Sequence, residues 1–145
     1  MAITTAMCTS FKSELLGGTH DLDTHSIKLA LIKATPTGTY GAATTNYSDV
    51  TGNSDEATGT GYTTGGQVLD SVTISTDGTT AIVDIADEVF TSSTISADGC
   101  IIYNASASNA AIAVIDFGGT QTSTNGDYTI QFPAADASNA IIRIA

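Results

Sequence analysis

Two histidines and two aspartates lie within six residues near the N-terminus, in the segment His20-Asp21-Leu22-Asp23-Thr24-His25. Imidazoles and carboxylates are ligands for zinc and other divalent cations. Alternate residues of an extended chain point to opposite faces, so at most three of these side chains can converge without a turn. The spacing matches no specific metal motif. We therefore interpret the segment as a polar connector and predict no metal or cofactor.

Acidic loops are the second place where a cation could bind. Asn53-Ser54-Asp55-Glu56 and Asp87-Glu88 carry the carboxylate oxygens that calcium prefers. Neither loop follows the order of ligands in an EF-hand. Acidity of a solvated surface is the simpler interpretation, and no calcium site is predicted.

The residues that could act together in catalysis give only a weak signal in this sequence. Asp84 and Asp116 each lie inside an apolar strand, where burial could raise a pKa as in a glycosidase acid. Alternation lets both side chains point to solvent instead. Cys8 could pair with His20 or His25 as a nucleophile, but it lies beside an apolar helical stripe and fits a core position. The sequence therefore predicts a protein that is not an enzyme, and a polysaccharide hydrolase is the third-ranked hypothesis.

Exposed aromatic rings are the usual platform for a sugar. Tryptophan is absent, and the rings that could serve are Tyr40, Tyr47 and Tyr62, in a long Gly- and Thr-rich loop over residues 35–66. A loop of this length in a small domain is often an interaction arm. The three tyrosines support a carbohydrate- or receptor-binding hypothesis.

A short amphipathic helix is predicted over residues 5–16. Met7, Phe11 and Leu15 recur at i, i+4 and i+8, and Gly17-Gly18 follows as a stop. So short a helix is marginal alone in water. Its apolar stripe must therefore dock on this chain or on a neighbour, and the sequence leaves that choice open.

The rest of the chain alternates with the period of strands. Ile27, Leu29 and Leu31 begin the pattern. The other predicted strands are 68–75 and 81–85 around an Asp77-Gly78 turn, a short one near 89–90, 100–104 and 110–117 ended by Gly118-Gly119, 128–132 opened by Asn125-Gly126 and stopped by Pro133, and 140–144. About seven or eight short strands indicate an all-β sandwich or jelly roll, formed as one domain over residues 1–145.

Charge and cysteine content narrow the function further. Lysine and arginine number 4 against 15 aspartates and glutamates, a net charge of -11, so the chain lacks the cations that nucleic acid requires. The N-terminal residues show neither a secretory signal nor a membrane span, which predicts a protein made in the cytosol. Cys8 and Cys100 are expected to be buried or partly buried free thiols.

Several stretches of the sequence carry a family likeness: residues 1–16 followed by Gly18, His20 and Asp21, and residues 26–31, 58–67 and 125–133. They resemble small structural proteins of tailed bacteriophages. The resemblance implies a virion protein assembled in the host cytoplasm, which we expect to be a capsid decoration or cement protein on the outside of the shell.

The partners expected from this resemblance are the major capsid protein or other virion proteins. A trimer is expected from capsid geometry, with many copies gaining from multivalency. The predicted adhesive surfaces are the stripe of Met7, Phe11 and Leu15 and the tyrosine-bearing loop. A tail, fibre or adhesion module that binds a host glycan is the alternative.

Overall fold

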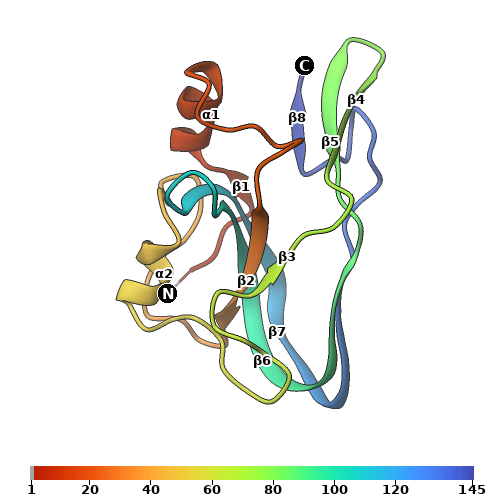
Figure 1. Cartoon of the computed structure of the whole chain (residues 1–145). Helices are drawn as coiled ribbons and strands as arrows, with labels where there is room; N and C mark the ends of the chain where they lie inside the picture. The colour runs from red at the N-terminus through yellow and green to blue at the C-terminus, as the bar shows by residue number, and fades with distance from the viewer. Residues whose placement is uncertain (1) are drawn as a thin grey trace.

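The computed structural model describes residues 2–145 and is built from two antiparallel sheets (Figure 1). The elements are β1 (Ala6–Met7), α1 (Thr9–Leu16), β2 (Ile27–Lys33), α2 (Ser48–Gly52), β3 (Gln67–Val68), β4 (Thr73–Asp77), β5 (Thr80–Asp84), β6 (Glu88–Asn104), β7 (Ala110–Ile130) and β8 (Ile142–Ile144). One sheet has the order β1-β7-β6-β2-β3 and the other β4-β5-β8. The predicted all-β sandwich is confirmed.

The five-stranded sheet holds most of the core. Its β2 strand carries four consecutive residues, 29–32, that are fully buried, so both of its faces are covered. Sequence alternation indicates only the face of Ile27, Leu29 and Leu31. β2 pairs with β6, from Ile27 opposite Asn104 to Lys33 opposite Ala97.

β6 and β7 form one long ribbon that bends back on itself in the lower half of Figure 1. The hairpin predicted around residues 106–109 is confirmed, but Gly118-Gly119 does not end its second strand, and Asn125-Gly126 does not open a separate one. Both pairs lie inside β7, with left-handed φ angles at Gly118, Gly119 and Asn125. Register shifts between Phe90 and Gly99 absorb the extra residues as bulges, which bend a ribbon without ending it.

The three-stranded sheet contains the hairpin predicted from Asp77-Gly78. β4 and β5 pair from Thr73 opposite Asp84 to Asp77 opposite Thr80, and Gly78 has a φ of 60° in the turn. The predicted strand 68–75 is split between β3 and β4. Ser71 causes the break, because its φ of 53° lies outside the extended region.

The helix and the long loop also differ from expectation in detail. Residues 6–7 pair with Val114 and Ala113 as β1, and the helix itself starts at Thr9. The 35–66 region contains the short helix α2 and is joined to the sheet by bridges such as Ile32 with Glu56 and Thr60 with Thr94. Within residues 2–145, neither helix has the length and apolar character needed to cross a membrane.

Candidate docking surface

The helical stripe predicted as an adhesive surface packs mainly on this chain. Phe11 is fully buried, and its ring meets the His20 ring edge-on, with centroids 4.9 Å apart. Met7, in β1, and Leu15 are half-buried and pack against the same core. Phe11 of the predicted apolar stripe therefore docks on this chain and not on a neighbour. The prediction that Phe11 is an interaction residue is wrong, because the helix is too short to be stable unless it buries this side chain.

The three tyrosines of the 35–66 region do not form an open platform. Tyr40 is 1% exposed and donates its hydroxyl to Asp55 at 2.6 Å. Tyr47 and Tyr62 donate to the two oxygens of Glu56 at 2.6 and 2.7 Å. Their predicted role as exposed stacking rings is corrected, because the phenols turn inward to satisfy carboxylates that the loop carries into the protein.

The ring faces of these tyrosines are occupied as well. Tyr47 stacks on Tyr103 with centroids 4.5 Å apart, and Tyr62 lies against Phe90. Burial, followed by the bond to Asp55, raises the pKa of Tyr40 to about 12. The tyrosines therefore remain protonated donors to carboxylates of the same loop, and the rings of Tyr47 and Tyr62 pack that loop against β6.

Asp55 makes a second set of contacts, which join the 35–66 region to β2. Its fully buried carboxylate lies 3.0 Å from the Lys33 ammonium and accepts the Gly38 N–H at 2.7 Å. Burial alone would raise the pKa of Asp55, but the hydrogen bonds from Thr37, Tyr40 and Gly38, with Lys33, hold it well below its usual range. Asp55 and Glu56, two of the carboxylates considered for calcium, thus bind donors of their own chain.

The histidine segment forms a polar connector, as interpreted from the sequence. His20 Nε2 lies 2.8 Å from Glu14, and the Asn104 amide nitrogen lies 3.0 Å from His20 Nδ1 and 2.9 Å from His25 Nδ1. These hydrogen bonds join α1 and the connector to the β6–β7 hairpin. Within residues 2–145 no three His, Cys, Asp or Glu side chains gather as a metal site.

The residues considered for catalysis are spread through the structure. Asp84 and Asp116 lie on different strands, β5 and β7, and the Asp84 side chain is exposed. Cys8 and Cys100 are buried free thiols, as predicted. The Cys8 sulfur lies 3.8 Å from the Gly41 carbonyl oxygen rather than beside a histidine.

An apolar groove lies between α1 and the three-stranded sheet, at the upper end of the molecule in Figure 1. Its volume is about 410 Å³. The lining residues are mostly aliphatic: Leu15, Gly18, His20, Asp21, Leu22, Ile74, Ala81, Ile82, Val83, Ile142 and Ile144. Cross-strand pairing sets Ile74 beside Val83, and Val83 beside Ile142, on one face of the sheet. We call this groove, together with Leu16 and strand β4, the docking surface.

Large apolar side chains are exposed at the docking surface. Ile74 and Ile144, which line the groove, are 54% and 52% exposed, and Leu16, which follows the lining residue Leu15 in α1, is 92% exposed. Exposed apolar side chains that gather around a groove mark an interaction site, whereas scattered ones do not. Val68, the fourth exposed large apolar residue, lies on β3 of the other sheet.

Strand β4 gives the docking surface an open backbone edge. All five of its residues are exposed, and β5 is its only neighbour in the sheet. Its sequence, Thr-Ile-Ser-Thr-Asp, has neither the lysine nor the proline that commonly protects an edge. The edge strands of the larger sheet, β1 and β3, are only two residues long. β8, the other edge of the smaller sheet, has three residues, so the five-residue β4 is the longest edge strand among residues 2–145 and the one best able to accept another strand.

Sequence reasoning missed Leu16, Ile74 and Ile144. Alternation marked Ile74 and Ile144 as strand residues, but it does not say which sheet face remains uncovered. Comparison of the chain with models of known protein families, with curated proteins and with solved structures finds no match. The geometry of the docking surface suits binding of another protein by apolar contact and strand addition.

Proposed function

We propose that this chain is a structural protein of a virus particle, a decoration protein that binds the outer face of a capsid shell and stabilises it. The observation that carries the proposal is the docking surface, an apolar groove beside an open strand edge. The resemblance to tailed-phage structural proteins supports the choice of a virion as its setting.

The partner surface should be apolar at its centre and basic around it. The groove lining includes only two ionisable residues, His20 and Asp21, so its floor offers apolar contact. The chain as a whole carries a net charge of -11. Complementary charge speeds association and suppresses wrong partners. A basic partner such as a shell subunit is therefore favoured over a second copy of this acidic chain.

The proposed complex gains strength from repetition. A single groove makes a modest contact with the shell. A shell offers many equivalent sites, so copies of the chain that are linked to one another bind with a high effective local concentration. We propose trimers on local threefold axes, because that arrangement matches the symmetry of a shell. Native mass spectrometry of the free chain would contradict this arrangement by giving only monomers.

Co-sedimentation with shells of the encoding virus that lack this chain tests the docking surface. Ile74→Asp places a charge in the groove and should weaken binding at least tenfold, as expected at the centre of an interface. Val68→Asp is the matched control, because Val68 is 51% exposed on the other sheet. Equal binding by the two folded variants, or no binding by the wild-type chain, would contradict the proposal.

A further inference from the structure

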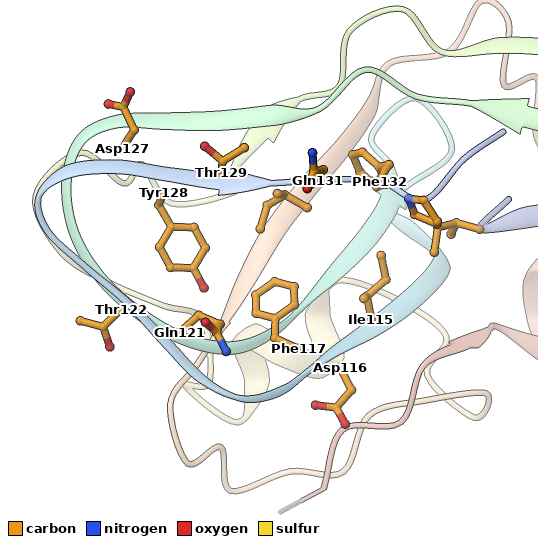
Figure 2. A pocket seen from close by; sticks show the side chains of 13 residues that line it. Ile115, Asp116, Phe117, Gln121, Thr122, Asp127, Tyr128, Thr129, Gln131 and Phe132 are labelled. Carbon is orange, nitrogen blue, oxygen red and sulfur yellow. The ribbon is translucent and has the colours of Figure 1, made fainter. Parts of the chain in front are cut away.

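The concave side of the bent β6–β7 ribbon encloses a second cleft, away from the docking surface (Figure 2). Residues 115–117 line one side and residues 128–133 the other, with Ile141 also in the lining. The volume is about 420 Å³. Clefts that bind small molecules usually measure ~300–1,000 Å³ and are mainly apolar with a few placed polar groups.

One buried polar group in this cleft has no partner. Among residues 2–145, the Tyr128 and Ser10 hydroxyls are the only buried side-chain polar groups without a hydrogen bond. Tyr128 is 6% exposed, and burial raises its pKa, so the hydroxyl is a donor in need of an acceptor. A buried polar group left unsatisfied costs about 1–3 kcal/mol, so an occupied acceptor position would stabilise it.

The polar side chains that line the cleft differ in direction, and three of them, Thr122, Thr129 and Gln131, are exposed. In Figure 2 the Tyr128 hydroxyl and the Gln121 carboxamide point toward the interior, whereas Asp116 and Asp127 point away from it. Both aspartates already accept hydrogen bonds from the β6–β7 ribbon: Asp116 accepts the Gly118 N–H, and Asp127 accepts the Ser92 N–H. The lining residues include no basic side chain to bind an anion, and the two carboxylates point away from the place where a cation or a sugar hydroxyl would lie, so the interior suits a neutral ligand of low polarity.

The apolar lining of the cleft indicates the shape and polarity of the rest of the ligand. Phe117 and Tyr128 lie with ring centroids 6.4 Å apart, Ile115 lies beside them in Figure 2, and Ile130 also lines the cleft. The Gln121 side chain is exposed and can turn aside, which gives a ligand access to the hydroxyl beneath it. Flat, weakly polar molecules match such a lining.

We propose that this cleft binds a small, uncharged ring compound that bears one acceptor oxygen, and that Tyr128 donates its hydroxyl to that oxygen. The ring lies against Phe117 and the aliphatic wall. The Gln121 carboxamide then closes over the ligand. This cleft shares no lining residue with the groove of the docking surface, so the test of ligand binding is independent of the test of the proposed function.

Acetophenone and isopropylbenzene are matched probes, because they have similar size and only the first carries a carbonyl oxygen. In NMR titrations of the isotope-labelled chain, both should shift the amide signals of residues 115–117 and 128–132. Acetophenone should bind about fivefold more tightly, the effect of one hydrogen bond of ordinary net strength. Tyr128→Phe should abolish that preference while leaving isopropylbenzene binding unchanged.

Tyr103→Phe is the matched control, because the Tyr103 hydroxyl is also buried but already donates to the Gly65 carbonyl at 2.7 Å. It should keep the fivefold preference. A second variant, Phe117→Trp, puts a larger ring beside Tyr128 and should weaken binding of both probes. The proposal is overturned if neither probe shifts these signals, if the shifts lie elsewhere, or if Tyr128→Phe keeps the preference.

Discussion

Replacing Asp55 by asparagine should weaken the fold more than any other change of a single charge. One oxygen of this buried carboxylate accepts the N–H and hydroxyl of Thr37, and the other accepts the Gly38 N–H and the Tyr40 hydroxyl, at 2.6–3.1 Å. Asparagine keeps only one acceptor oxygen. Whichever way its amide turns, the NH₂ group faces a backbone N–H.

The cost follows from the hydrogen bonds that asparagine cannot accept. Hydrogen bonds to a charged group contribute ~1.5–3 kcal/mol each, and Asp55→Asn removes at least two. The Lys33 ion pair at 3.0 Å disappears as well, although Lys33 is 35% exposed and regains water. We expect the free energy of unfolding to fall by about 3–5 kcal/mol at neutral pH. Urea unfolding followed by circular dichroism measures it, and the exposed Asp84→Asn should change it by less than about 0.5 kcal/mol.

The pH dependence of the same variant gives an independent check. The folded state holds the pKa of Asp55 below its usual range, so its stabilisation is present above about pH 4, where the unfolded carboxyl is ionised. The stabilisation is lost as the pH falls toward the folded pKa. The difference between wild type and Asp55→Asn should therefore narrow from about pH 5 to about pH 2. A cost below about 1 kcal/mol, or a constant difference across this range, would refute the reasoning.

Two further predictions concern the backbone and the thiols. Gly66 has a φ of 72°, and a Cβ there would overlap the Leu29 carbonyl oxygen, so Gly66→Ala should cost about 3 kcal/mol, whereas Gly52→Ala, in open space, should be nearly neutral. Equal urea midpoints for the two variants would contradict this. Burial raises the pKa of Cys8 to about 11 and that of Cys100 further, so iodoacetamide should label the native chain slowly and the urea-unfolded chain fast. Rapid labelling of either native thiol would show that it is exposed.

Local signals predicted the elements that depend on neighbouring residues alone. The Asp77-Gly78 hairpin follows from its turn chemistry and the alternation on each side of it. Gly118-Gly119 and Asn125-Gly126 carry the same chemistry but lie in bulges of a continuous strand. Bulges and tight turns both need left-handed residues, so sequence alone does not distinguish them.

The interaction residues were harder to predict, because exposure depends on tertiary structure. Tyr40 has the chemistry of a sugar platform, but its hydroxyl meets Asp55, fifteen residues away, inside the protein. Ile74 has the chemistry of a core residue, but it stays 54% exposed on β4, where it lines the groove beside α1. Binary patterning says that a residue belongs on an apolar face, and only the packed structure says whether that face is buried.

A three-dimensional reconstruction of the virus particle that encodes this chain tests the proposed function most directly. We predict density for the chain on the outer surface of the capsid, with α1, β4 and the groove that Ile74 lines facing the shell. Absence of the chain from the capsid, or attachment through the face that bears Val68 with the groove open to solvent, would contradict the proposed function.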